Sequence, residues 1–111
     1  MNSNPTAKQK RWHQWLRDSG CAICHNPTAI HHIAGSKMKL KGVKKPGEWF
    51  CVPLCYNHHQ GDDGIHANKR AFEKKHGTEK ELFKCMVEIY GINHEDKPMS
   101  EADYQAIMDR A

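Results

Sequence analysis

The chain has 111 residues, which is enough for one domain with one modest hydrophobic core. Hydrophobic residues make up only 38% of the chain, so a staple such as a bound metal would help it to fold. The net charge of +4 is unevenly spread: residues 1–78 hold 13 Lys and Arg against 5 Asp and Glu, whereas residues 79–111 hold 4 against 8. A basic front with an acidic tail indicates a polyanionic partner for one surface.

The sequence argues against a membrane-spanning protein and against a secreted one. No apolar run approaches membrane-spanning length, and the N-terminal "MNSNPTAKQKRW" lacks the apolar core of a secretory signal. We therefore expect a cytoplasmic protein, whose thiols stay reduced. In that setting five cysteines and nine histidines indicate metal ligands rather than disulfides.

The predicted elements are short and closely spaced. Asn4 and Pro5 predict the cap and first turn of a helix over about residues 5–19, which Gly20 ends. Two strands are then expected, at residues 29–33 and 49–54, joined by a lysine-rich loop. A capping box formed by Thr78 and Glu81 begins a later helix. The helical segments that follow the strands are expected at residues 67–77, 79–90 and 100–110.

The strongest chemical signal is a set of cysteines and histidines with zinc-ligand spacing. Cys21 and Cys24 form a Cys-x-x-Cys pair, and Cys55 with His58 repeats the spacing. A tight turn can supply two ligands of a tetrahedral zinc site at this spacing, so these four residues predict a structural Zn²⁺. Cys51 with Cys55 is the alternative second pair. We favour His58, because Cys51, like Cys85, lies in an apolar run and is expected to pack as a small buried hydrophobic residue.

Four more histidines gather around this predicted zinc site: His31, His32, His59 and His66. Near pH 7 a histidine can be a neutral metal ligand or a general base, and a hydrolytic site needs both. Adjacent residues of a regular strand point to opposite faces, so a common target for His31 and His32 predicts a bulge or a strand end there.

These motifs together resemble a known nuclease family. The phrases "IHHI", "VPLCYNHH" and "GIH" resemble the HNH nucleases, whose core is a ββα-metal fold. The longer phrases "CAIC", "IHHIAG", "VPLCYNHHQG" and "GIHANKRAFEKKHG" resemble the phage recombination-enhancement (Ref) nucleases, which are described as RecA-dependent. The resemblance covers about residues 20–77, and its combined motifs are specific where each alone is weak.

The resemblance implies roles for individual residues. His32 would be the general base, and His31, His59 and His66 would hold a catalytic divalent metal, which would be Mg²⁺, Mn²⁺ or Zn²⁺. The middle Asn of the HNH family has no counterpart near Phe50, so the residue that orients the base is unassigned. The expected setting becomes a bacterial cell or a phage-infected host, with DNA and RecA filaments as partners.

Basic side chains predict how DNA would be held. The lysine-rich loop between the strands and the helix after the last histidine both present cations to phosphates without reading sequence. The residues expected to contact DNA are Lys37, Lys39, Lys41, Lys44, Lys45, Lys69 and Arg70.

The sequence thus predicts a single α+β domain over residues 1–111. Its zinc-stapled ββα-metal core would span about 20–77, between an N-terminal helix at about 5–19 and C-terminal helices at about 79–110. The expected function is metal-dependent hydrolysis of DNA phosphodiester bonds by an endonuclease. The alternative is a non-catalytic zinc module that binds nucleic acid or a recombination protein, and a metal-storage or redox protein fits less well because it would not need the basic loop.

Overall fold

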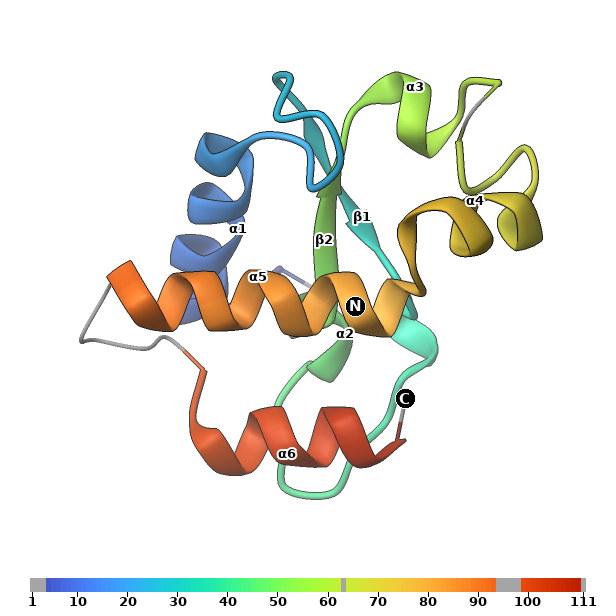
Figure 1. The fold of residues 1–111 in the computed structure, drawn as a ribbon. Coiled ribbons are helices and arrows are strands. Elements are labelled where there is room, and N and C mark those ends of the chain that lie inside the picture. Colours follow the sequence, from blue (N-terminus) through green and yellow to red (C-terminus); the bar gives the residue numbers. More distant parts are fainter. Residues whose placement is uncertain (1–3, 63, 94–98, 111) are drawn as a thin grey trace.

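A computed structural model describes residues 4–62, 64–93 and 99–110, without the side chains of Ser36, Ile92 and Asn93. Within these residues the fold is α+β, with a two-stranded antiparallel sheet surrounded by helices (Figure 1). The elements in chain order are α1 (Ala7–Ser19), β1 (Ala29–His32), the 3-10 turn η1 (Gly35–Lys37), α2 (Pro46–Trp49), β2 (Cys51–Leu54), α3 (Tyr56–His59), α4 (Lys69–His76), α5 (Glu79–Asn93) and α6 (Glu101–Arg110).

The N-terminal helix starts two residues later than the sequence predicted. Thr6, rather than Asn4, caps α1, because its hydroxyl accepts from the backbone amide of Gln9 while the Gln9 side chain accepts from the amide of Thr6. This reciprocal capping box satisfies two backbone amides that would otherwise have no helical partner. The predicted end of the helix at Gly20 is confirmed.

The two strands pair in a regular register. Ala29 lies opposite Leu54, and His31 and His32 lie opposite Val52 and Cys51. The predicted bulge at the two histidines is therefore wrong, whereas the predicted strand end is confirmed, because His32 is the last residue of β1. Period-two alternation then sends the two histidine side chains to opposite faces of the hairpin.

The second strand is shorter than predicted. Residues 49 and 50 do not extend it, because Pro46 starts the short helix α2, which carries Trp49 as its last residue. The carbonyl of Trp49 accepts a hydrogen bond of 2.9 Å from the Trp12 indole, so this turn is fastened to α1. The loop between the strands therefore contains ordered structure rather than a free lysine-rich connection.

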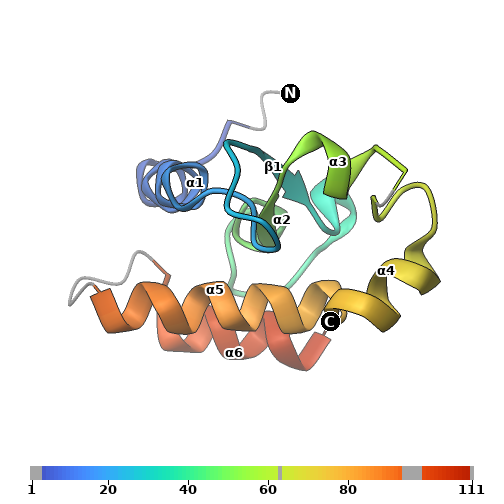
Figure 2. The same cartoon turned by 45° about the horizontal axis from the view of Figure 1, so that its top comes forward.

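The core lies between the hairpin, α1 and α5, and Figures 1 and 2 show α5 crossing the hairpin with α6 alongside it. Phe83 is fully buried there, and its ring meets those of Trp12 and Phe50 edge to face. The capping box at Thr78 and Glu81 is confirmed. Cys85 was expected to be buried but is exposed, because two residues along a helix from Phe83 it points away from the core.

No helix in the described part of the chain is both long and apolar enough to cross a membrane.

Candidate metal centres and the histidines around them

The structure brings Cys21, Cys24, Cys55 and His58 together at one end of the hairpin, and we call these four residues the knuckle. The Sγ atoms of Cys24 and Cys55 are 3.6 Å apart, and His58 Nδ1 lies 3.2 Å from Cys55 Sγ and 3.7 Å from Cys21 Sγ. A tetrahedral zinc site has edges of about 3.8 Å between two sulfurs and about 3.6 Å between sulfur and nitrogen. The donor set and its spacing therefore fit a Zn²⁺ ion.

Local backbone bonds shape the knuckle. The amide of Cys21 donates to the carbonyl of Asn26, and the amide of Ala22 donates to the carbonyl of Pro53, so the turn is tied to β2. Burial alone would raise the pKa of the Cys21 thiol, but hydrogen bonds from backbone amides, including that of Ile23, outweigh it and lower the pKa. A thiol whose pKa is lowered in this way is a better metal ligand.

The alternative pairing of Cys51 with Cys55 does not occur in the structure. Cys51 is fully buried in β2 and its thiol points to the carbonyls of Gly47 and Glu48, away from the knuckle. Burial raises the pKa of this thiol, which keeps it protonated. Cys51 is therefore a packed thiol, as its apolar surroundings in the sequence predicted.

A second cluster consists of His31, His59 and His66, and we call it the histidine triad. The ring centroid of His31 lies 4.8 Å from that of His59 and 5.4 Å from that of His66, and the rings of His59 and His66 are 4.6 Å apart. One ligand nitrogen from each residue falls within 4.8 Å of the other two. Three imidazoles in this arrangement can hold a divalent metal and leave further coordination positions for water or substrate.

A glycine makes the triad possible. His66 reaches His59 because the chain folds back on α3, and the amide of His66 donates to the carbonyl of His59. A Cβ atom on Gly64 would lie 2.7 Å from the carbonyl carbon of His59, closer than side chains tolerate. The turn between α3 and α4 therefore requires a glycine at this position.

Glu79, which the sequence analysis did not single out, completes the surroundings of the triad. Its Oε2 accepts a hydrogen bond of 2.7 Å from His31 Nε2, and both side chains are largely buried, with 13% and 8% exposed. Since neutral His31 then carries its proton on Nε2, its Nδ1 is left as the metal donor. A carboxylate that fixes a ligand histidine in this way is common at protein metal sites.

The charges around Glu79 and His59 favour metal binding. Burial would raise the pKa of Glu79, but the hydrogen bonds from His31 and Lys69 outweigh it and lower the pKa. Burial, together with the positive charges of His31 and His66, lowers the pKa of His59. An ionised carboxylate at Glu79 and a neutral imidazole at His59 are the protonation states that a bound cation requires.

His32 lies on the other face of β1, apart from the triad. Its Nε2 donates to Glu48 Oε1 at 2.8 Å, and its side chain is 42% exposed. The ring of His13 lies beside it, and His13 Nε2 donates to the backbone carbonyl of Glu48 at 2.6 Å. His13, His32 and Cys51 also lie close enough to hold a metal, but the buried protonated thiol and the committed His13 nitrogen make this the poorest of the three groups.

Comparison with known protein families assigns the sequence to one family. A family model described as "Protein of unknown function (DUF968)" matches residues 4–90. The chain belongs to the DUF968 family. The match runs from before α1 to within α5, so it includes every residue of the knuckle and of the histidine triad. No significant match was found among curated proteins or among solved structures.

The cations that were predicted to contact DNA in this DUF968 member lie in two places. The lysine loop, which carries Lys37, Lys39, Lys41, Lys44 and Lys45, and helix α4 lie toward different ends of the hairpin (Figure 1). Lys69, predicted to contact DNA, forms an ion pair of 3.3 Å with Glu79 Oε1 while 62% of its side chain stays exposed. Arg70 is also exposed on α4.

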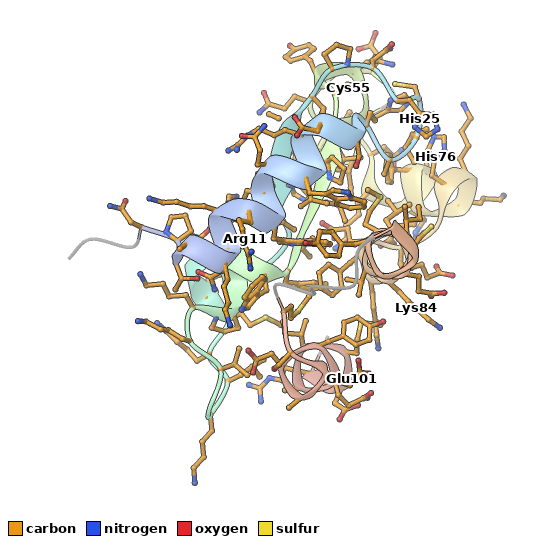
Figure 3. All side chains as sticks on the ribbon, turned by 90° about the vertical axis from the view of Figure 1, so that its left-hand side faces the viewer. Arg11, His25, Cys55, His76, Lys84 and Glu101 are labelled. Carbon is orange, nitrogen blue, oxygen red and sulfur yellow. The ribbon has the colours of Figure 1, made fainter. Side chains whose placement is uncertain are left out.

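Sequence reasoning on this DUF968 chain missed three supporting residues: Glu48, Glu79 and Gln9. Each makes its supporting contact across more than fifteen residues of sequence, although Gln9 also belongs to the capping box of α1. His25 lies outside all three metal-binding groups within the described residues. Figure 3 shows His25 and Cys55 at the knuckle end of the molecule, far from Glu101 on α6.

Proposed function

We propose that this protein is a metal-dependent DNA endonuclease of the HNH, ββα-metal type. The observation that carries the proposal is the histidine triad on one face of β1 with His32, held by a carboxylate, on the other. The resemblance of "IHHI", "VPLCYNHH" and "GIH" to HNH nucleases supports the same assignment of roles. The knuckle beside the triad supports a zinc-stapled core.

Opposite faces suit the chemistry of phosphodiester hydrolysis. In-line displacement requires the attacking and leaving oxygens on opposite sides of the phosphorus. The sheet has two strands in the described residues, so the other edge of β1 pairs with no strand there. A phosphate lying across that edge meets His32 from one side and the triad from the other.

The roles then divide by residue. His32 donates through Nε2 to Glu48, which leaves Nδ1 as the acceptor for a proton from water. In HNH nucleases an Asn orients the general base, and this chain has no such Asn near Phe50. Glu48 takes that role here, because its carboxylate holds His32. His31, His59 and His66 would hold a divalent metal, which would supply charge stabilisation for the phosphate and the leaving oxygen. Lysines 37, 39, 41, 44 and 45, with Arg70, hold neighbouring phosphates, and Lys69 does so while paired with Glu79.

A plasmid-nicking assay tests the proposal. Wild-type protein with intact knuckle zinc is incubated with supercoiled DNA and Mg²⁺, Mn²⁺ or Zn²⁺, with and without RecA filaments on single-stranded DNA. His32→Asn is compared with His25→Asn, a matched change at an exposed histidine whose positive φ asparagine tolerates. We expect nicking that His25→Asn retains and His32→Asn lowers by about 10²–10⁴-fold.

Two results decide against parts of the proposal. If no metal supports nicking but DNA binding is retained, the protein is a non-catalytic zinc module. If nicking is the same with and without RecA filaments, the RecA partnership is wrong while the endonuclease assignment stands.

A further inference from the structure

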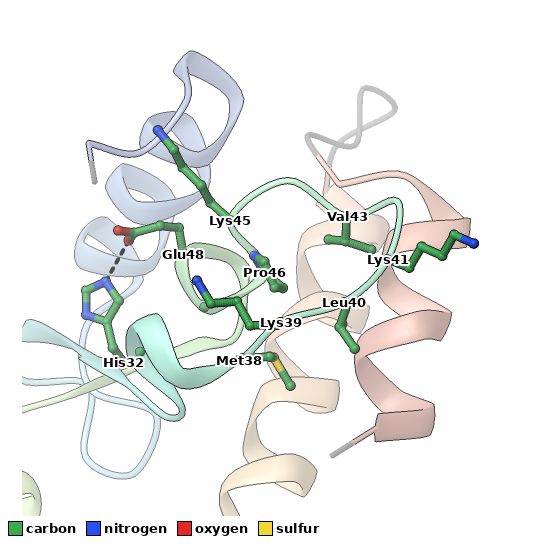
Figure 4. A pocket seen from close by; sticks show the side chains of 11 residues that line it. His32, Met38, Lys39, Leu40, Lys41, Val43, Lys45, Pro46 and Glu48 are labelled. Atoms are coloured by element: carbon green, nitrogen blue, oxygen red, sulfur yellow. Dashed lines mark hydrogen bonds and ion pairs between the residues drawn. The ribbon is translucent and has the colours of Figure 1, made fainter. Parts of the chain in front are cut away.

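A cavity of about 720 Å³ opens beside His32, on the face of β1 away from the histidine triad (Figure 4). Its volume is within the range of about 300–1,000 Å³ typical of sites for small organic groups. Aliphatic side chains of Met38, Leu40, Val43 and Pro46 form much of its lining. The strand end that carries the proposed general base, His32, therefore adjoins a largely apolar cavity.

The far wall of the cavity is pre-formed. The amide of Val43 donates to the carbonyl of Leu40, which closes a tight turn with Gly42 at φ 84°. This backbone geometry is typical of a type II turn and needs glycine at its third position. The wall can thus receive a ligand without first becoming ordered.

Helix α1 holds the rim of the cavity in place. The Gln9 side chain is 1% exposed and its Nε2 donates to the carbonyls of both Lys44 and Lys45 at 3.0 Å. A buried amide that satisfies two carbonyls of one loop fixes the position of that loop. The Lys45 ammonium also donates to the carbonyl of Asn4.

The charged side chains of the cavity lie on one side of it. Figure 4 shows the Lys39 amino group on the side of His32 and Glu48, whereas Leu40 and Val43 lie on the other side and the Lys41 side chain extends away. Glu48 Oε1 is engaged by His32. The cavity therefore complements a group that has an apolar body and a neighbouring anion.

We propose that this cavity binds the base of one unpaired nucleotide, with the adjoining phosphate beside Lys39 and His32. This inference rests on the proposed endonuclease function and names its substrate class as single-stranded DNA or a duplex with a locally unpaired nucleotide. A base inside a duplex is stacked and paired, so it enters such a cavity only after leaving the helix, which costs free energy. DNA that already holds an unpaired base avoids this cost.

The test is a binding measurement without added divalent metal, using protein whose knuckle zinc is intact. Three oligonucleotides share one sequence with 2-aminopurine at one position, which is single-stranded, bulged in a duplex or fully paired. We expect the bulged and single-stranded probes to bind at least about tenfold more tightly than the paired probe. We also expect the 2-aminopurine fluorescence to change on binding.

Matched variants locate the effect. Val43→Phe fills the cavity and should remove the preference, whereas Ile89→Phe enlarges an exposed aliphatic side chain on α5 and should keep it. Lys39→Glu should weaken binding of the unpaired probes more than Lys84→Glu, which makes the same charge change on α5 (Figure 3). The lysine pair tests the site even if Val43→Phe does not fold.

The outcomes separate the two proposals. Equal affinity for paired and unpaired probes overturns the cavity proposal, and so does a preference that both Val43→Phe and Lys39→Glu leave unchanged. If the preference depends on these residues but no metal supports nicking, the cavity proposal stands and the endonuclease function fails. If nicking occurs with no such preference, the reverse holds.

Discussion

The knuckle and the histidine triad are neighbours in sequence and differ in what they can do. His58 and His59 are consecutive in α3, yet one faces Cys21 and Cys55 and the other faces His31 and His66. Four donors close a tetrahedron around zinc, whereas three donors leave positions for water or substrate. The number of donors, rather than their location, is thus the feature that we expect to separate a structural site from a catalytic one.

The two clusters also differ in their support. The knuckle is assembled from two turns: a backbone hydrogen bond from Ala22 to Pro53 ties the first to β2, and the second, α3, directly follows β2. The triad depends in addition on Glu79 at the start of α5, 48 residues from His31. A closed site can be complete within its own motif, whereas an open site needs outside groups to orient its ligands.

The largest expected effect comes from breaking the knuckle. Cys55→Ser should remove one equivalent of tightly bound zinc and abolish cooperative unfolding. Binding energy on the order of 10 kcal/mol for a structural zinc is comparable to the whole stability of a small domain. Zinc analysis and circular dichroism measure both effects, with Cys85→Ser as the control at an exposed cysteine. A folded Cys55→Ser protein with its full zinc content would contradict the assignment.

A smaller effect is expected at the triad. Glu79→Gln should lower the affinity of the triad for a divalent metal by about 10–100-fold, because His31 loses the carboxylate that orients it. The knuckle zinc and the thermal unfolding of the zinc-loaded chain should change little. Calorimetric titration with Mn²⁺ measures the affinity, and Glu88→Gln, an exposed change on α5, is the control. Equal losses in both variants would remove Glu79 from the metal site.

The pH dependence of metal binding separates the clusters further. Burial first, and then the charges of His31 and His66, put the pKa of His59 below its ordinary value of 6.5. The folded chain therefore binds fewer protons there, so the stability that neutral His59 contributes is present above pH 6.5 and is lost as the pH falls through the lowered pKa. Between pH 6.5 and about 8.5, the ordinary thiol pKa, the contribution of His59 to the metal affinity of the triad should stay level.

Knuckle affinity should instead rise with pH across that window, by about tenfold per pH unit for each thiol proton that zinc displaces. Competition with a chromophoric chelator at several pH values measures both affinities. Parallel pH profiles for the two clusters would show that they do not differ in the way proposed.

The smallest effect is expected at Cys51, the buried cysteine outside both clusters. Cys51→Ala should leave zinc content unchanged and lower the free energy of unfolding by about 1 kcal/mol, because only one buried sulfur is removed. Chemical denaturation and zinc analysis test this. A loss of zinc would return Cys51 to the list of ligands that its spacing from Cys55 first allowed.

Some of the fold was predictable because local signals were strong. The end of α1 at Gly20 and the capping box at Thr78 are short-range patterns, and the structure contains them. The errors also have local causes. The capping pair of Thr6 and Gln9 outcompeted Asn4, and Pro46 began a helical turn that runs into the first residue predicted as strand, Trp49.

The sequence by itself determined which residues cluster. The ligands come in pairs that are close in sequence: Cys-x-x-Cys, Cys-x-x-His and pairs of histidines. A few turns and one hairpin are therefore enough to bring the knuckle and the triad together. The tertiary structure alone decided which side of β1 each histidine faces and which carboxylate holds it. Register fixes the first, and contacts of Glu48 and Glu79 across 16 and 48 residues fix the second. No local pattern encodes such contacts, because they form only when separate elements pack together.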